Sequence, residues 1–355
     1  MSEPQLRLIP DCGPLITEIA LYADAELFTP AGLARRAAYG ALIGALPPAI
    51  ALFVLCQRQT APHLRDWFTA DFPTRDFYAV TAGSTSDPSL GWIQDPVLAA
   101  TDGRTRVFIQ PRHSDRDQDH AVWLAHHFGA PLLALDADMA GGNLLVAADF
   151  MIAGAAAINR TVNRYGSAGL QRLKALNPRL HIFGSPGPDG VSLSQEPFHI
   201  DLAVSLTGLS RDGQPVLLVA DPRVSDSVFD FDNAWADGLD GAAARLRADG
   251  FHVIRNPIPV TGTARHPHRM IPRCYNNVLL ENEIRPGTAS GRPLVWLPVF
   301  GTPGDRLADF DAANAAIWAG LGFEVIAVPG FEVHAGSYGA LRCALKVLAR
   351  RGWCS

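Results

Sequence analysis

Four side chains of this sequence could together carry out chemistry on a cation. Cys343 follows the small-residue run 335–340, and a thiol near a helix N-terminus is favoured as the reactive thiolate. His199 and Asp201 alternate along a predicted strand, so both project to the same side and could supply an acid/base and a cation anchor. Asp95 lies among apolar residues, where a carboxylate is costly unless it is paired or well hydrogen-bonded. Asp95 and Asp201 could therefore grip a planar cation such as a guanidinium from two sides.

Each of these residues also has a plainer interpretation. A cysteine in an apolar setting is more often a buried core residue, and a His-x-Asp pair can simply face solvent. Asp95 stands before Pro96, where an aspartate commonly opens a turn. A site is favoured because Asp95, Asp201 and Cys343 occupy the same position in an internal repeat.

The repeat consists of five tetrapeptides, each of which runs directly into an apolar stretch. They are Trp92-Ile93-Gln94-Asp95, Ala140-Gly141-Gly142-Asn143, Phe198-His199-Ile200-Asp201, Cys274-Tyr275-Asn276-Asn277 and Ala340-Leu341-Arg342-Cys343. Such a repeat means several copies of one supersecondary unit, which bring corresponding residues to corresponding places. We therefore expect two carboxylates, a histidine and a thiol to lie around one centre.

Between these tetrapeptides the sequence predicts strands that alternate with helices. The segments 107–135, 216–254 and 294–326 each read as strand, helix and strand. In the first of them, Ser114 and Asp117 resemble a helix N-cap box, and Gly129 resembles a helix stop. Two further segments, 50–80 and 169–183, fit less regularly, with short helices near Leu64 and near 169–173. The pattern predicts an α/β chain, and a spacing of roughly 50 to 80 residues suits a closed ring of units.

The composition excludes several classes of function. The chain has 355 residues, 48% of them hydrophobic, and a net charge of -5, which leaves no electrostatic footprint for nucleic acid or an anionic membrane. Its five cysteines are odd in number and lack metal-finger spacing, so we expect a reduced, cytoplasmic setting with no metal and no cofactor. No secretory signal precedes the first strand, and the apolar stretch 37–56 is broken by Pro47-Pro48, which predicts a helix followed by a buried strand rather than a membrane span. Homo-oligomerisation stays open.

On these residues the sequence resembles the pentein superfamily of guanidino-group-modifying enzymes, which comprises the arginine, agmatine and peptidylarginine deiminases and the amidinotransferases. The resemblance runs from about residue 49 to the end, and it is greatest to the peptidylarginine deiminase type, in which Trp-Ile-Gln-Asp, His-x-Asp and Gly-x-x-x-Cys occur in this order. It implies a single catalytic domain over 1–355, folded as a five-bladed pseudo-symmetric α/β propeller with the N-terminal segment packed on it.

The resemblance also implies a role for each residue. Cys343 would be the nucleophile, His199 the general acid/base, and Asp95 and Asp201 the guanidinium clamp of a deiminase that acts on arginine, a peptidyl arginine or an arginine derivative. The thiolate would form a covalent thiouronium intermediate and release ammonia. Further candidates for substrate contact are Trp92, Asn143 and Asn277, although hydrogen bonds to loop backbone are an alternative role for Asn276 and Asn277.

Two departures from the family pattern bear on these expectations. Ala140 stands where arginine and agmatine deiminases have a glutamate, so one carboxylate is missing. Arg342 stands where relatives often have histidine; since Cys343 should face inward, alternation predicts that Arg342 points away from the site. Among the remaining histidines, His266, His268 and His334 could rim the site or face solvent. An amidinotransferase of the same fold and a non-catalytic binding protein remain the alternatives to a deiminase.

Overall fold

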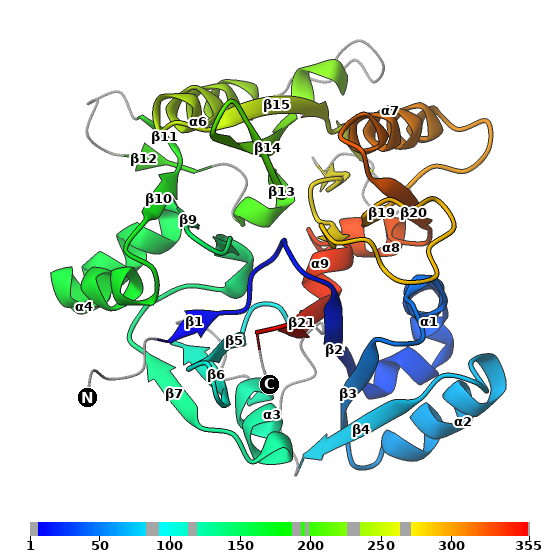
Figure 1. The fold of residues 1–355 in the computed structure, drawn as a ribbon. Helices are drawn as coiled ribbons and strands as arrows, with labels where there is room; N and C mark the ends of the chain where they lie inside the picture. Colours follow the sequence, from blue (N-terminus) through cyan, green and yellow to red (C-terminus); the bar gives the residue numbers. More distant parts are fainter. Residues whose placement is uncertain are drawn as a thin grey trace.

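The protein is a mixed α/β structure, as the alternation of predicted strands and helices indicated. The computed structural model describes residues 6–82, 92–112, 119–186, 193–195, 199–225, 235–262 and 271–353. Five sheets of three or four strands account for most of the strands in this part of the chain. Figure 1 shows these sheets placed around the middle of the molecule, with helices toward the outside.

The five sheets share one plan, in which an antiparallel pair is followed by a parallel strand reached through a helix. The second sheet has the order β1 (Arg7–Leu8), β5 (Leu98–Thr101), β6 (Arg106–Pro111) and β7 (Leu132–Leu135), with α3 (His120–Phe128) between β6 and β7. The third joins β8 (Leu144–Val146), β9 (Met151–Gly154) and β10 (Leu180–Phe183), with α4 (Ala155–Leu176). The fourth joins β13 (Val204–Arg211), β14 (Gln214–Asp221) and β15 (His252–Pro257), with α6 (Ala236–Ala248). The fifth joins β18 (Leu279–Leu280), β19 (Leu294–Pro298) and β20 (Glu324–Val328), with α7 (Arg306–Gly320).

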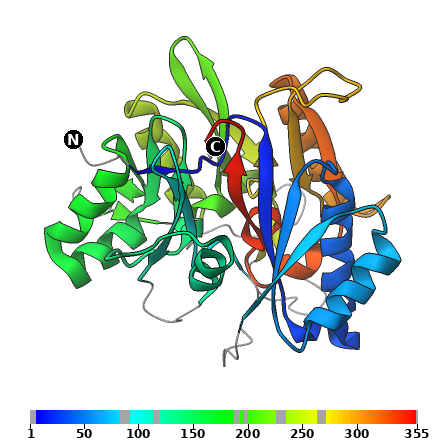
Figure 2. The same cartoon turned by 60° about the horizontal axis from the view of Figure 1, so that its bottom comes forward.

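The first sheet joins the two ends of the chain. Its order is β21 (Leu345–Arg350), β2 (Ile16–Ala23), β3 (Ala51–Gln57) and β4 (Phe77–Ala82), with α1 (Leu33–Ala45) and α2 (Ala61–Asp71) as the crossovers. The last strand pairs antiparallel with β2, and Figure 2 shows the two side by side. Because β2 and α1 precede residue 49, the N-terminal segment supplies an inner strand of a sheet.

The apolar stretch 37–56 is the end of α1 followed by β3, which confirms the predicted helix and buried strand. β3 lies between two parallel neighbours and is buried along residues 52–56, so its sequence is apolar at successive positions rather than at alternate ones. Within the described residues, no helix is both long enough and apolar enough to cross a bilayer.

Several predicted boundaries need correction. The helix expected near 169–173 is part of α4, which spans 22 residues with a non-helical Gly166 inside it. α3 ends at Gly129 in the left-handed conformation, as predicted, but its N-cap is Asp119. Ser114 and Asp117 lie outside the described residues.

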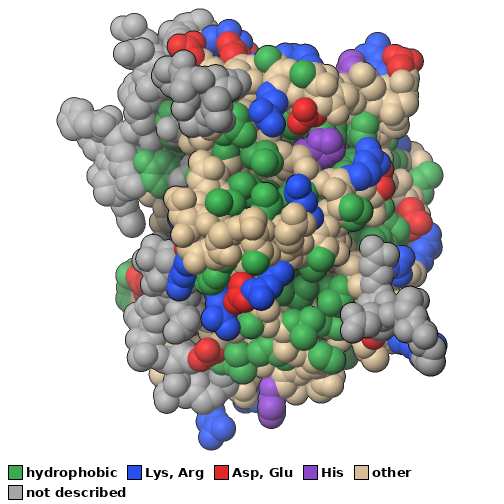
Figure 3. All heavy atoms as spheres, turned by 90° about the vertical axis from the view of Figure 1, so that its left-hand side faces the viewer, with side chains coloured by type: hydrophobic (Ala, Val, Ile, Leu, Met, Phe, Trp, Pro, Cys, Tyr) green, Lys and Arg blue, Asp and Glu red, His purple; other side chains and the backbone are tan. Residues whose placement is uncertain are grey.

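The strand β7 carries exposed apolar side chains at the outer edge of the second sheet. Leu132 and Leu133 are both exposed there. Figure 3 shows the side of the molecule to the left in Figure 1, where hydrophobic side chains are scattered and both charge signs are interspersed. Among the described residues of that face, the charges form no continuous basic surface of the kind that binds nucleic acid.

Candidate functional site

The five repeated tetrapeptides occupy equivalent places, because each leads into the first strand of one of the five sheets. Asp95 precedes β5, Asp201 lies in the short 3-10 helix η4 (Ile200–Leu202) before β13, and Cys343 lies in the single helical turn α9 (Leu341–Ala344) before β21. Asn143 and Asn277 precede β8 and β18. The repeat therefore corresponds to a structural unit, and its last residues stand at the inner starts of the sheets (Figure 1).

The structure brings the four predicted reactive side chains together. Cys343 Sγ lies 3.6 Å from Asp201 Oδ2, and His199 Nδ1 lies 3.7 Å from Asp95 Oδ1. Asp201 is fully buried and senses the charges of both His199 and Asp95. A thiol, an imidazole and two carboxylates thus share one small region of the protein.

His199 reaches this region by a different backbone from the one predicted. It is extended, with φ -117° and ψ 135°, but it directly precedes η4, so the expected His-x-Asp strand is wrong. Gly142 makes room for the imidazole: a Cβ at this position would lie 2.6 Å from His199 Nδ1 and 3.1 Å from Asp95 Oδ1. The Gly142 N–H also donates to Asp95 Oδ1 over 3.0 Å. Close packing therefore requires a glycine at position 142.

Asn277, a predicted substrate contact, holds Cys343 in place through its side-chain amide. Its Oδ1 accepts the Cys343 N–H at 3.0 Å, and its Nδ2 donates to Cys343 Sγ at 3.3 Å and to the Asp201 carbonyl at 3.2 Å. One amide thus fixes the backbone and the thiol of Cys343 as well as the turn that carries Asp201. The two backbone bonds agree with the alternative role given to Asn277, whereas the contact with the thiol was not predicted.

The other predicted contact residues lie around the site in different ways. Trp92 packs directly on Gly339, where a Cβ would come within 2.5 Å of the indole. Asn143 is buried, and its Oδ1 accepts from Gln195 Nε2 at 2.7 Å. Asn276 donates to the Leu218 carbonyl, in line with the backbone-bonding alternative.

Burial and the two carboxylates raise the pKa of the Cys343 thiol well above 9, with desolvation as the largest cause and Asp201 and Asp95 next. The expected helix-stabilised thiolate is therefore wrong for the free protein. Cys343 does not precede a long helix; it lies inside one turn that leads into β21. A cation placed between the carboxylates would remove two of the causes that raise this pKa.

Arg342 points into the site, against the prediction from alternation. Residues 341–344 form a helical turn, so successive side chains do not alternate between two faces as in a strand. Arg342 Nη1 donates to Asp201 Oδ2 at 2.7 Å, while its Nε and Nη2 donate to Asp11 Oδ1 at 3.0 and 2.9 Å. Burial raises the pKa of Asp201, and the guanidinium of Arg342 acts against that rise.

His334 does not face solvent, and its ring packs against Trp92, one of the predicted contact residues. It is buried in α8 (Glu332–Ala335), with ring centroids 5.6 Å from Trp92, 5.7 Å from Tyr39 and 5.1 Å from Phe331. Neither ring nitrogen has a hydrogen-bond partner within the described parts of the chain. Burial lowers the pKa of His334 to about 3. His266 and His268 lie outside the described residues.

Two buried imidazoles predict acid destabilisation of the fold. Burial lowers the pKa of His120 to about 4 and that of His334 to about 3, so both stay neutral in the folded protein when the unfolded chain takes up protons below pH 6.5. The stability that they contribute is present above pH 6.5 and is lost as the pH falls. Each should cost about 2 kcal/mol of unfolding free energy between pH 7 and pH 5. Urea unfolding of the wild type and of His120→Leu at both pH values tests this, since the variant should lose less stability on acidification; equal losses would contradict it.

The described residues contain no group of three or more His, Cys, Asp or Glu side chains that could hold a metal ion.

Solved structures with the same fold are deiminases. The agmatine deiminase of C. jejuni, as a cysteine-to-serine variant with substrate bound, superposes with a TM-score of 0.67 at 14% identity, covering 96% of this chain and 95% of that one. The agmatine deiminase of Enterococcus faecalis gives 0.63 at 13% identity, over 98% and 96%. A third structure, provisionally described as a peptidyl-arginine deiminase, gives 0.66 at 13% identity over 98% of both chains. No protein-family model and no curated protein matches the sequence. At these identities the likeness establishes the fold, and the fold agrees with the resemblance that the motifs indicated.

Proposed function

We propose, from the fold that this chain shares with the agmatine deiminases, that it is a cysteine-dependent hydrolase that removes ammonia from the guanidinium group of arginine, a peptidyl arginine or an arginine derivative. The observation that carries the proposal is the thiol of Cys343 held 3.6 Å from a buried carboxylate of Asp201, in one region with His199 and Asp95. We propose further that residues 1–355 form a single catalytic domain, and that the five sheets are the blades of a pseudo-symmetric propeller.

Binding of a guanidinium follows from the electrostatics of the site. Asp201 is fully buried and Asp95 is three-quarters buried, so two carboxylates lie where water cannot screen them well. A planar cation can donate to both carboxylates at once. This contact positions the guanidinium carbon near Cys343 Sγ and polarises a carbon that is otherwise a poor electrophile.

The same contact prepares the nucleophile. The negative charges of Asp201 and Asp95 raise the pKa of the thiol in the free protein. A bound guanidinium offsets these charges, so the thiol loses its proton more easily once a substrate is present. The enzyme therefore keeps an unreactive thiol until a cation occupies the clamp.

His199 carries the proton transfers in this proposal. His199 takes the thiol proton, and the thiolate attacks the guanidinium carbon and forms the C–S bond. The protonated imidazole then donates to the departing nitrogen, and the C–N bond breaks to release ammonia. The neutral imidazole next takes a proton from water, whose hydroxide adds to the thiouronium carbon. Cleavage of the C–S bond releases the ureido product, with one proton lost to solvent, and the imidazole returns its proton to the sulfur to restore the thiol.

A non-catalytic binding protein is the second candidate, and one observation favours it. Arg342 already donates to Asp201, and the thiol is protonated in the free state, so the site resembles a cation-binding site as much as a reactive one. An amidinotransferase would differ from the hydrolase only in the acceptor, an amine in place of water. Addition of glycine or ornithine to the assay distinguishes the two enzymes.

The test is thiol reactivity combined with product release. With arginine, agmatine and a peptidyl arginine as substrates, we expect ammonia and a ureido product from at least one of them. With 2-chloroacetamidine, a cationic reagent, we expect Cys343 to react faster near pH 7 than with neutral iodoacetamide, because only the amidinium can occupy the clamp. With iodoacetamide the rate should rise only above pH 9, because the free thiol has a raised pKa. No ammonia from any substrate, together with equal rates for the two reagents, would refute the hydrolase.

A further inference from the structure

Arg342 connects the buried carboxylate of Asp201 to the N-terminal segment of the chain. Its guanidinium donates to Asp201 Oδ2, to Asp11 Oδ1 and to the Leu144 carbonyl, at 2.7, 2.9 and 2.9 Å. We propose that Arg342 is a positioning residue, which keeps Asp201 charged and turned so that Oδ1 receives the guanidinium of the substrate. This role rests on the proposed function. It assigns a task to Arg342, which stands where members of the family that the sequence resembles often have histidine.

Asp201 needs a compensating charge because its carboxyl group is buried. Asp201 has no exposed surface and lies near a second carboxylate, Asp95, and both features favour the protonated form. A neutral Asp201 could not attract a guanidinium. The ion pair with Arg342 supplies the compensating charge at hydrogen-bond distance, so the carboxylate can stay ionised inside the protein.

The two carboxylate oxygens of Asp201 have different surroundings. Oδ2 accepts from Arg342 and lies 3.6 Å from the thiol of Cys343. Oδ1 is buried and has no hydrogen-bond partner in the described structure. A buried carboxylate oxygen left unpaired is costly, so it marks the place for a donor that arrives with the ligand. The position of Arg342 thus decides which oxygen of Asp201 is available.

Arg342 is itself held in place through Asp11. The second oxygen of Asp11, Oδ2, accepts the Val146 N–H at 2.8 Å, and the Asp11 N–H donates to the Val146 carbonyl at 2.7 Å. These bonds fix Asp11 to β8, next to the Leu144 carbonyl that Arg342 also contacts. The guanidinium therefore lies in a rigid frame and has little freedom to leave Asp201.

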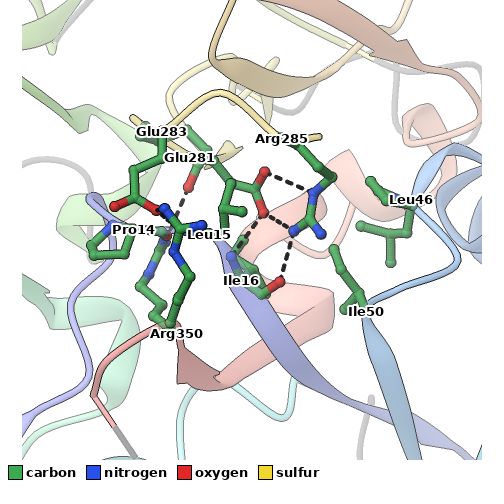
Figure 4. Close-up of polar contacts among 12 residues, drawn as sticks. Pro14, Leu15, Ile16, Leu46, Ile50, Glu281, Glu283, Arg285 and Arg350 are labelled. Carbon is green, nitrogen blue, oxygen red and sulfur yellow. Dashed lines mark hydrogen bonds and ion pairs between the residues drawn. The ribbon is translucent and has the colours of Figure 1, made fainter. Parts of the chain in front are cut away.

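The rest of the N-terminal segment is anchored equally well. Arg350 donates to the Pro10, Asp11 and Pro14 carbonyls at 2.8, 2.7 and 2.6 Å, and the Ile16 N–H donates to Glu281 at 2.8 Å. Figure 4 shows how Arg350, Glu281 and Arg285 surround residues 14–16. The segment before β2 thus forms a fixed support, and Asp11 and Arg342 link this support to the site.

The experiment measures the clamp with a probe and does not require the natural substrate. In the full chain, we compare the rates at which 2-chloroacetamidine and iodoacetamide alkylate Cys343, from pH 5 to pH 10. For Arg342→Gln we expect the ratio of the two rates at pH 7 to fall by about tenfold or more, because Asp201 loses a charged hydrogen-bond partner that keeps it ionised and turns Oδ1 toward the substrate. The acid limb of the pH profile, which is the fall in the rate of amidine alkylation as the pH is lowered, should move to higher pH. Arg342→Lys keeps the charge and should retain most of the ratio.

Other groups also face Asp201, and the pH profiles must be read with them in mind. They are His199, Asp95, Cys343, Cys274 and Lys346. All are present in both the wild type and the Arg342 variants, so a difference between the profiles reports on Arg342. A ratio and an acid limb unchanged in Arg342→Gln would overturn the proposal.

Two further variants separate this role from general stability. Arg75→Lys weakens three hydrogen bonds to the Leu46, Pro47 and Ile50 carbonyls without touching Arg342, Asp11 or a carboxylate of the site, so it should lower the unfolding midpoint and leave the amidine-to-amide ratio unchanged. If Arg342→Gln fails to fold, Arg342→Met tests the same idea, because it also removes the charge beside Asp201; the ratio should fall and the acid limb should move to higher pH, and an unchanged ratio would contradict the proposal. A wild-type protein that shows no preference for the amidine refutes the proposed function itself, and the role of Arg342 with it.

Discussion

Replacement of Cys343 by alanine is expected to lower the rate of ammonia release by roughly 10⁵-fold or more, the scale of loss seen when a covalent nucleophile is removed. The side chain lies beside Asp201 and receives a hydrogen bond from Asn277, so the thiol is held next to the carboxylate that would bind the guanidinium. The clamp itself stays intact in this variant. Turnover should therefore vanish while a guanidino compound still binds, which calorimetry or a shift of the melting temperature can measure.

Cys56→Ala is the matched control for this variant. Cys56 is also a buried free cysteine, but it lies in β3 within the first sheet. Its loss should leave kcat unchanged and cost only a modest amount of stability, because a small buried side chain has been shortened. Residual activity of more than about one per cent in Cys343→Ala would contradict a covalent mechanism through this thiol.

Much of the fold could be predicted because each tetrapeptide of the repeat is followed directly by an apolar run. The apolar runs after Asp95, Asp201 and Cys343 become β5, β13 and β21, since each strand starts with buried apolar residues directly after a polar turn. The helix and strand after residue 33 were recognisable from Pro47-Pro48, which no single helix could contain. These features depend on local sequence, so they could be read without coordinates.

The predictions that failed, or were not made, concern contacts between segments that are far apart in the sequence. Arg342 turns inward because Asp11, 331 positions earlier, accepts two of its N–H groups. Asn277 reaches Cys343 across 66 positions, and β2 pairs with β21 from opposite ends of the chain. The raised pKa of the Cys343 thiol also follows from burial beside Asp201, which periodicity cannot reveal. Residue types and repeat positions thus indicated which side chains meet, while the charge states and partners of those side chains required the structure.

Loss of either clamp carboxylate, Asp201 or Asp95, should strongly reduce activity, and the two losses should differ in their effect on stability. Asp201→Asn and Asp95→Asn should each lower kcat/KM by roughly 10²-fold or more, because each loses a hydrogen bond to a charged group worth about 1.5–3 kcal/mol together with the charge itself. Steady-state kinetics with the preferred guanidino substrate measure this loss. Equal kcat/KM in Asp95→Asn and the wild type would remove Asp95 from the clamp.

Asp201→Asn and Asp95→Asn should also differ in their free energy of unfolding. Asp201→Asn removes the buried partner of Arg342, and loss of one member of a buried ion pair costs about 3–5 kcal/mol; since Asp11 still faces the guanidinium, we expect about 3 kcal/mol. Asp95 is a quarter exposed, and an asparagine oxygen can still accept the Gly142 N–H, so Asp95→Asn should cost less than about 1 kcal/mol. Urea unfolding at pH 7 measures both. If Asp201→Asn were as stable as Asp95→Asn, the buried pair would contribute little, and Arg342 would have no reason to be held so firmly beside the thiol.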